Sequence, residues 1–233
     1  LTFDDGLASQ KDIALDVIES EGHTGIFFVY SSVFEGHLER LEIYRAYRTR
    51  YFDKIDEFYD RFFTEVNDSL YRDRYAIAMK SFSPKNYLTE YPFYSENDRR
   101  FRFIRDEVLG PGPYEEIMDN MINSQTSLAI LSNDLWMTNK DLSEIKSRGH
   151  VVGLHSYSHP TKFVDLSKTE QENEYRLNRN HLRTVLGVDP ITVSHPCNSY
   201  NDATFRILDR LAIKVGFRAN MRGQFKTKFE YPR

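Results

Sequence analysis

Cysteine is almost absent from this chain of 233 residues: Cys197 is the only one. One cysteine excludes an internal disulfide framework and is typical of reducing compartments, so we expect the cytoplasm rather than export. The chain starts at Leu1, without a methionine and inside an apolar stretch, and stops at Arg233 without a recognisable end. We therefore expect a fragment truncated at both ends, whose missing N-terminus leaves the compartment open.

Long apolar runs and a surplus of positive charge are missing as well. No segment approaches the ~20 apolar residues of a membrane-spanning helix, and none has the pattern of a signal peptide. The formal net charge is −4, and no basic cluster indicates a surface for nucleic acid or anionic membranes. Hydrophobic residues make up 40% of the chain, which is enough for a globular core. We expect a globular protein with no transmembrane segment and no nucleic-acid partner.

Short apolar runs alternate with amphipathic stretches in the first and last parts of the chain. The predicted strands are 1–6, 24–30, 128–131, 150–154, 191–193 and 213–217, and the predicted helices are 8–21, 139–147, 168–186 and 201–211. In the first helix, Ile13, Val17 and Ile18 fall on one face. A repeating strand and helix order implies a parallel sheet, so the predicted fold class is α/β, a closed or nearly closed (β/α) barrel.

The segment between about 36 and 126 has a different pattern. Apolar and aromatic residues recur at intervals of three and four from Leu38 to Val66, which predicts one long amphipathic helix, and further helices are predicted around 70–79, 101–109 and 114–122. Residues 38–135 hold 18 of the 32 Tyr and Phe residues, so we expect this segment to bury a small core of its own. We interpret it as a helical insertion in a single domain, 1–233, and as a candidate surface for oligomer formation.

Two motifs hold the side chains best suited to catalysis. Leu1-Thr2-Phe3-Asp4-Asp5-Gly6 is an apolar run that ends in two carboxylates, and His155-Ser156-Tyr157-Ser158-His159 directly follows a predicted strand. Histidines at i and i+4 lie on one face of a helical turn, so both imidazoles can reach one metal ion. With one carboxylate they form a set that leaves positions open for water and substrate. Each motif alone has a plainer interpretation, a turn or cap for the acids and loop contacts for the histidines, but their joint position at strand ends favours a metal site.

These motifs resemble those of a known family. Thr2-Phe3-Asp4-Asp5-Gly6, the segment 149–159 and the more degenerate segment 196–201 are similar to motifs of the polysaccharide deacetylases with the NodB homology fold, the fourth family of carbohydrate esterases. The resemblance covers roughly 1–35 and 126–220 and leaves the helical insertion outside. It implies a distorted (β/α) barrel and the removal of N-acetyl or O-acetyl groups from glycans with a divalent metal. Zinc is the expected ion, and Co, Ni, Mn and Fe are the other candidates.

Carried over residue by residue, the resemblance makes Asp4 the general base and Asp5 a metal ligand together with His155 and His159. The chemistry agrees with this division, because a carboxylate bound to a cation is a poor proton acceptor, whereas its neighbour can hold the attacking water. The metal would lower the pKa of its bound water from 15.7 toward ~7 and polarise the acetyl carbonyl.

The third motif of the family corresponds to the segment 194–201. In the family, the residue after its proline supplies a backbone N–H to the oxyanion, and here Cys197 follows Pro196; the thiol need not take part. The family motif ends in an aromatic residue and a glycine, whereas this chain has Tyr200 and Asn201. These four residues form the predicted oxyanion and substrate-binding set.

The arginine that opens this motif in the family, and that orients the base, is replaced by Ser194. Either another cation fills the role or Asp4 is less well held. Arg218, Arg222 and Arg233 are the candidates.

The late histidine that protonates the departing amine in the family is not recognisable in this chain. His195, beside the predicted oxyanion donor, is either a substitute catalytic acid or a hydrogen-bonded structural histidine. An O-acetyl esterase is therefore an alternative, since an alkoxide leaves more easily than an amine.

The predicted activity is that of a metal-dependent hydrolase acting on carbon–nitrogen bonds other than peptide bonds. Its expected substrate is an N-acetylated sugar of a polysaccharide, glycolipid or precursor, in the biosynthesis of cell-surface polysaccharide. The alternatives are an O-acetyl carbohydrate esterase, a metal-dependent amidohydrolase on a non-sugar amide, and a degenerate, non-catalytic glycan-binding domain.

Overall fold

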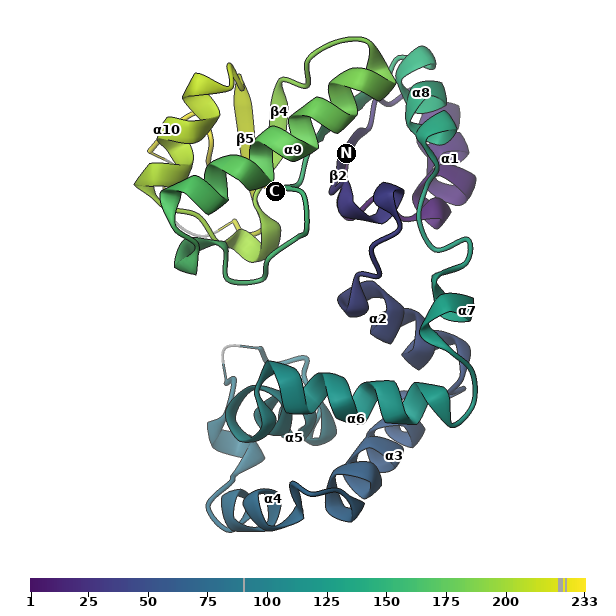
Figure 1. Ribbon diagram of the computed structural model, residues 1–233, viewed down its shortest axis with the longest axis vertical. Coiled ribbons are helices and arrows are strands. Elements are labelled where there is room, and N and C mark those ends of the chain that lie inside the picture. Colours follow the sequence, from purple (N-terminus) through teal and green to yellow (C-terminus); the bar gives the residue numbers. More distant parts are fainter. Residues whose placement is uncertain (90, 222–223, 225) are drawn as a thin grey trace. The chain divides into compact units, whose positions relative to one another are not determined.

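The computed structural model describes residues 1–89, 91–221, 224 and 226–233. The chain divides into two compact units, one formed by Leu1–Glu39 with Asp134–Arg233 and the other by Arg40–Asn133 (Figure 1). The strands lie in the first unit, and the second is built from helices. Within the described ranges, no helix is both long and apolar enough to cross a membrane.

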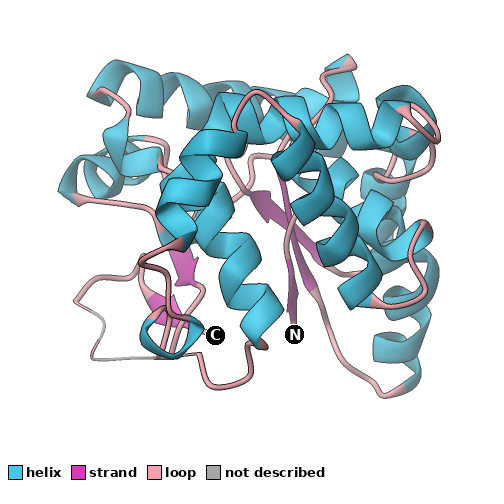
Figure 2. Ribbon diagram, turned by 90° about the horizontal axis from the view of Figure 1, so that it is seen from below, coloured by secondary structure: helices cyan, strands magenta, loops and turns pink. Residues whose placement is uncertain are grey.

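A single sheet of six parallel strands organises the first unit, with its arrows set among helices in Figure 2. The strands are β1 (Thr2–Phe3), β2 (Ile26–Val29), β3 (Val151–Leu154), β4 (Thr192–Ser194), β5 (Val215–Arg218) and β6 (Tyr231–Pro232). They follow one another across the sheet in chain order, and each neighbouring pair is parallel. The predicted α/β class with a distorted barrel is confirmed, in the form of a curled half-barrel whose edge strands are β1 and β6.

The helices of this unit begin and end where the sequence supplies caps. They are α1 (Asp16–Ser20), α8 (Asn139–Ser147), α9 (Lys168–Leu186) and α10 (Asp202–Arg210). The side chains of Thr138, Ser167 and Asn201 accept backbone N–H groups at the starts of α8, α9 and α10, and Gly187, with φ 70°, ends α9. Short polar side chains are efficient N-caps, and glycine reaches the left-handed region without steric cost. The predicted bounds 139–147 and 168–186 are therefore confirmed.

The first helix buries a different face from the predicted one. Leu15 and Ile18 are buried, but Ile13 is 67% exposed and Val17 is 57% exposed. The cause is a π-helical segment, Gln10–Leu15, that precedes α1. Its hydrogen bonds span five residues rather than four, so the turn is wider and the spacing of 3.6 residues no longer identifies the buried side.

The sheet core needs a glycine in β3. A Cβ atom on Gly153 would lie 2.3 Å from Thr192 Oγ1 and 2.8 Å from the ring of Phe28. Any larger residue would therefore separate β3 from the side chains of its two neighbouring strands, so glycine is needed here for packing rather than for an unusual backbone angle.

The second unit has its own aromatic core, as expected. Its helices are α2 (Arg40–Arg50), α3 (Ile55–Asp68), α4 (Arg72–Met79), α5 (Glu96–Phe103), α6 (Pro111–Asn123) and α7 (Leu128–Ser132), with a π-helical segment, Ile104–Leu109, after α5. Phe58, Phe62 and Phe101 are each at most 5% exposed. The ring centroids of Phe62 and Phe101 are 4.9 Å apart, at 71° to each other, an edge-to-face contact that adds to the burial of both rings.

Two local predictions in this unit are wrong. The single helix predicted from Leu38 to Val66 is two helices, α2 and α3, with a break between them. Apolar residues recur at helical spacing on both sides of the break because each helix buries an apolar face. The apolar run 128–131, predicted as a strand, is helix α7. Ser127 caps it by accepting the N–H of Ile130, and Ile130 is 58% exposed. A short apolar run has too few residues for its period to separate helix from strand.

Candidate metal centre

The turn after β1 places two carboxylates at the carboxyl end of the sheet. Asp5 has φ 75° and Gly6 has φ 64°, so two consecutive residues are left-handed and the chain turns sharply. The turn is held from both sides, because Gln10 donates to the Asp4 carbonyl and the N–H of Met137 donates to the Gly6 carbonyl at 2.9 Å. A left-handed aspartate costs energy, and such strain is common where a side chain must be aimed at a site.

His155 and His159 converge through a loop, and the predicted helical turn is wrong. Residues 155–160 follow β3 without helical structure, and Ser156 and His159 have φ values of 68° and 53°. Glu174 of α9 holds this loop, since its Oε2 accepts the N–H groups of Tyr157 and Ser158 at 2.9 and 2.8 Å. Its Oε1 accepts the Ser158 hydroxyl at 2.7 Å. The glutamate thus fixes the backbone between the two histidines.

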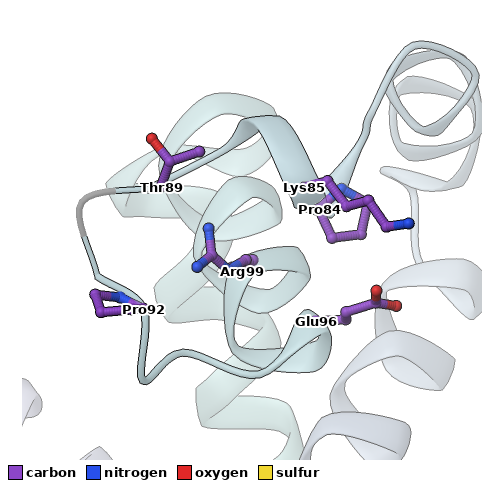
Figure 3. A pocket seen from close by; sticks show the side chains of 6 residues that line it. All are labelled: Pro84, Lys85, Thr89, Pro92, Glu96 and Arg99. Atoms are coloured by element: carbon purple, nitrogen blue, oxygen red, sulfur yellow. The ribbon is translucent and has the colours of Figure 1, made fainter.

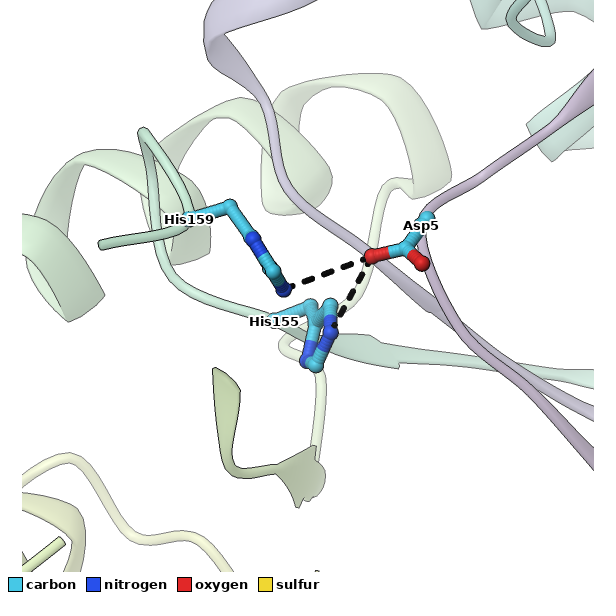
Figure 4. Close-up of side chains that lie close together, drawn as sticks. All are labelled: Asp5, His155 and His159. Atoms are coloured by element: carbon cyan, nitrogen blue, oxygen red, sulfur yellow. Dashed lines mark ion pairs between the residues drawn. The ribbon is translucent and has the colours of Figure 1, made fainter. Parts of the chain in front are cut away.

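Asp5, His155 and His159 face one another, as Figure 4 shows. Asp5 Oδ1 lies 3.4 Å from Nε2 of each histidine, and the three ligand atoms are all within 4.8 Å of one another. Ligand atoms ~2.0–2.1 Å from one Zn²⁺ in a tetrahedral arrangement lie about 3.4 Å apart. The spacing and the donor types therefore fit a first-row divalent ion such as zinc.

Hydrogen bonds made by Nδ1 and by the backbone N–H of His155 orient its Nε2 toward Asp5 and His159. Its Nδ1 lies 2.8 Å from the carbonyl of Ser194, which can only accept, so Nδ1 carries a proton and Nε2 is the ring nitrogen on the side of Asp5. The His155 N–H donates at 3.0 Å to Asn178, a fully buried residue of α9 that also donates at 2.9 Å to the Val29 carbonyl. Ser194 thus orients the imidazole, and Asn178 fixes the backbone that carries it.

The electrostatics of the cluster favour a cation. His155 is 1% exposed, and burial alone would lower its pKa. The carboxylates of Asp5 and Asp4 outweigh that effect and raise the pKa of His155 above its usual range. Two carboxylates therefore make positive charge favourable at a buried point, which is the condition a metal site requires.

Asp4 is held on one oxygen only. Its Oδ2 accepts hydrogen bonds from Arg233 and, at 3.2 Å, from the hydroxyl of Ser194. Arg233 also donates at 2.6 Å to Ser194 Oγ and at 3.0 Å to Thr2 Oγ1. Asp4 Oδ1 is buried and has no hydrogen-bond partner among the described residues. One oxygen is thus anchored, and the other can accept a hydrogen bond from a bound molecule.

Part of the chain is similar to a known family. Residues 117–216 match the family model described as polysaccharide deacetylase. The predicted resemblance to the polysaccharide deacetylases is confirmed over these residues. No curated protein matches the sequence.

Two solved deacetylase structures share the fold. The deacetylase PplD of Streptococcus pyogenes, in complex with acetate, superposes with a TM-score of 0.50 at 16% identity, over 94% of this chain and 55% of that one. The BpsB deacetylase domain from Bordetella bronchiseptica superposes with a TM-score of 0.53 at 12% identity, over all of this chain and 69% of that one. This chain spans little more than half the length of the streptococcal protein.

Ser194 stands where the resemblance predicts an arginine, and Arg233 contacts Asp4 instead. Arg233 follows β6, and the curling of the sheet brings it beside Asp4, 229 positions earlier in the sequence. Arg222 lies outside the described residues. Arg218 ends β5 and is 7% exposed. No strand was predicted for the last residues. Tyr231-Pro232 is followed by the charged residue Arg233, much as β1 is followed by Asp4, so a signal was present.

The rest of the third motif forms a tight turn. Pro196 is buried, and Cys197 and Asn198 have φ values of 49° and 56°. The N–H of Asn198 donates to the His195 carbonyl at 3.2 Å, and Cys197 is exposed. The turn presents Cys197 on the surface of the unit, and its part in oxyanion binding stays a prediction.

His195 has contacts that favour the structural one of its two predicted roles. It is 1% exposed, its Nε2 donates to the Phe229 carbonyl at 2.8 Å, and burial lowers its pKa to about 4. Tyr200 stacks on it at 4.3 Å between ring centroids. The side-chain Oδ1 of Asn201 accepts the N–H groups of Ala203 and Thr204 at the start of α10. The substrate contacts predicted for Tyr200 and Asn201 stay predictions.

Sequence reasoning missed Glu174, Asn178 and the hydrogen bonds of Ser194. A signal for Asn178 is present in α9, whose buried side includes Tyr175, Asn178 and Leu182. An amide within an apolar stripe needs a buried hydrogen-bond partner.

Proposed function

We propose that this chain is a metal-dependent deacetylase that hydrolyses the acetyl group of an N-acetylated sugar in a polysaccharide, glycolipid or precursor. The observation that supports it is the cluster of Asp5, His155 and His159 with Asp4 beside it, on a polysaccharide deacetylase fold. In this proposal the substrate is an acetylated carbohydrate, and the metal is zinc or another first-row divalent ion.

Asp5, His155 and His159 would hold the ion. When bound, such an ion polarises an acetyl carbonyl and lowers the pKa of water. The two histidines are neutral donors and Asp5 contributes one negative charge, so the site keeps a net positive charge to stabilise an oxyanion. Glu174 and Asn178 would keep the donors aimed at one point before substrate arrives.

Asp4 would act as the general base. Arg233 and Ser194 fix its Oδ2, so the carboxylate plane is set and Oδ1 can accept a proton from water. Because Asp4 Oδ2 lies 3.7 Å from His155 Nε2, the base is adjacent to the metal ligands. Proton transfer to a group positioned in this way contributes typically 10²–10⁴-fold in rate.

The environment of His195 favours a second candidate, an O-acetyl esterase on the same residues. A histidine with a pKa of about 4 and its N–H already donated to Phe229 is poorly placed to protonate an amine. An ester needs less help, since an alkoxide is a better leaving group than an amide nitrogen.

Acetate release tests both candidates. The metal-loaded protein is incubated with N-acetylglucosamine oligomers, with O-acetylated xylan and with small non-sugar amides, and acetate is quantified. We expect release from the N-acetylated sugar; release from the O-acetyl substrate alone would select the esterase, and release from the amides alone a different amidohydrolase. Bound metal with no release from any of the three would leave a non-catalytic glycan-binding domain.

Replacing Arg233 by methionine is expected to lower kcat roughly 10-fold, because Asp4 loses a charged hydrogen-bond donor and becomes less well oriented. KM and metal content should stay unchanged, and Arg233→Lys should restore part of kcat. Arg176→Met, on the exposed side of α9, is the matched control. An equal loss in Arg233→Met and the control, or a loss confined to KM, would contradict the positioning role.

Replacing Glu174 by glutamine is expected to weaken metal binding roughly 10- to 100-fold, as for other groups that orient metal ligands. The change keeps the size of the side chain but removes the charge that accepts the loop N–H groups of Tyr157 and Ser158. Glu172→Gln, two residues away on α9, is the control. Equal metal affinities of the two variants, measured by competition with a chelator, would show that the loop does not depend on Glu174.

A further inference from the structure

The helical unit 40–133 contains a cavity of about 190 Å³ whose charged lining residues are all arginines. It is lined by Leu41, Tyr44, Arg45, Arg48, Phe58, Phe101, Arg102, Arg105, Tyr114 and Met118. Arg45 and Arg48 are three residues apart on α2, and Arg102 and Arg105 are three apart along α5 and the π-helical segment after it. Residues at this spacing share a helix face, so each pair faces the cavity from its own helix.

Two of the four charges are compensated nearby. Arg45 pairs with Glu42, and Arg105 forms two hydrogen bonds with Asp106, at 2.6 and 2.8 Å. Each of these pairs joins neighbours on one helix. Their guanidinium groups still line the cavity, but the net charge that they bring to it is small.

Arg48 and Arg102 have no such compensation. In the described part of the chain, neither has a carboxylate within ion-pair distance, and Arg102 Nε is buried without a hydrogen-bond acceptor. The guanidinium of Arg102 lies 4.2 Å from the ring centre of Tyr94. Arg102 helps to lower the pKa of Asp98. The Asp98 carboxylate, however, accepts hydrogen bonds from Tyr59 and Ser95 and forms no ion pair with Arg102. A buried guanidinium nitrogen without an acceptor costs free energy, so the position of Arg102 indicates binding rather than stability.

The walls of the cavity are aromatic and rigid. Phe58 and Phe101 are buried, with ring centroids 5.5 Å apart, and Phe101 lies 6.1 Å from Tyr114. Burial raises the pKa of Tyr114 to about 12, although Arg105 and Arg48 act in the opposite direction. The phenol therefore stays neutral and adds a hydroxyl donor beside the arginines.

We propose that this cavity binds a phosphate monoester. Its two uncompensated charges match the charge of about −1.5 to −2 on such a group near neutral pH, and guanidinium groups bind phosphate oxygens with paired hydrogen bonds. A water molecule needs roughly 10–15 Å³ on this scale, so the cavity has room for a phosphate and part of the group that carries it. All of its lining residues belong to the helical unit 40–133.

Another hollow in the same unit makes a useful contrast. It measures about 350 Å³ and is lined by Pro84, Lys85, Thr89, Pro92, Glu96 and Arg99 (Figure 3). Arg99 donates to the carbonyls of Tyr87, Tyr91 and Tyr94, so its guanidinium stabilises the surrounding loop. The larger hollow differs from the arginine-lined cavity because its lining includes a carboxylate, Glu96, and because its one arginine already donates to three carbonyls.

Calorimetric titration of the full chain with glucose 6-phosphate and with inorganic phosphate tests the proposal, with glucose and glucuronate as controls. We expect saturable binding of both phosphates at one site per chain, weaker at higher salt, and no binding of glucose. Arg48→Gln and Arg102→Gln should each weaken binding about tenfold or more. Arg72→Gln, an exposed arginine of α4 outside the cavity, should leave it unchanged.

Several outcomes would overturn the proposal. Absence of saturable phosphate binding would do so directly, and equal weakening by Arg72→Gln would show a non-specific charge effect. Glucuronate binding as tight as that of glucose 6-phosphate would contradict recognition of a dianion. The melting temperatures of ligand-free Arg48→Gln and Arg102→Gln should not fall, since each change removes an uncompensated charge; a fall would indicate that the arginines stabilise the unit.

Discussion

Alanine in place of Asp5 or His155 is expected to abolish metal retention. Each change removes one of the three protein donors that lie within 4.8 Å of one another. Asp4, the carboxylate beside the site, is held at Oδ2 by Arg233 and Ser194, so it is not free to move into the place of a lost donor. Metal content after dialysis, measured by elemental analysis, should fall from about one ion per chain to background.

Two controls separate loss of the site from loss of the fold. His23→Ala removes an exposed histidine of the same unit and should retain metal. Asp5→Asn keeps the shape of the side chain but removes its charge, so it should weaken metal binding while circular dichroism stays unchanged. A His155→Ala variant that still binds one ion per chain tightly would show that the three residues are not the ligands.

Asparagine in place of Asp4 is expected to keep the metal and lower kcat roughly 10²- to 10⁴-fold. The asparagine carbonyl can still accept from Arg233 and Ser194, which leaves the NH₂ group where Oδ1 stands. An amide nitrogen donates rather than accepts, so the variant cannot take a proton from water. Steady-state acetate release and metal analysis on the same sample give both quantities.

Combining Asp4→Asn with Arg233→Met sharpens this assignment. If Arg233 acts through Asp4, the double variant should be no slower than Asp4→Asn alone, because the group that Arg233 positions has already lost its function. Additive losses would assign Arg233 a separate role. Activity of Asp4→Asn equal to that of the unchanged protein would refute Asp4 as the base.

Much of the metal centre could be predicted because its parts are local in sequence. Asp4 and Asp5 end one strand, and His155 follows another. Carboxyl ends of neighbouring parallel strands meet at one edge of a sheet. The order of strands and helices was enough to place these side chains together, and the caps of α8 and α9 fixed the bounds of those helices.

The predictions failed where a local pattern had two solutions. His155 and His159 were expected on a helical turn, but Glu174 makes a strained loop favourable there by accepting two of its N–H groups. The spacing of Ile13 and Val17 predicted a buried face, but a π-helical turn rotated them outward. In both cases the spacing of residue types along the chain does not show the hydrogen bonds that set the local backbone conformation.

The sequence by itself determined the α/β class, the paired acids and histidines and the capped helices, because each depends on neighbours along the chain. Only the tertiary structure decided how Asp4 is held. Ser194 stands where an arginine was expected, and the cation comes from Arg233 after β6, 229 positions from Asp4. The curling of the sheet brings its last strand to the carboxylate of its first, and no local pattern reports that approach.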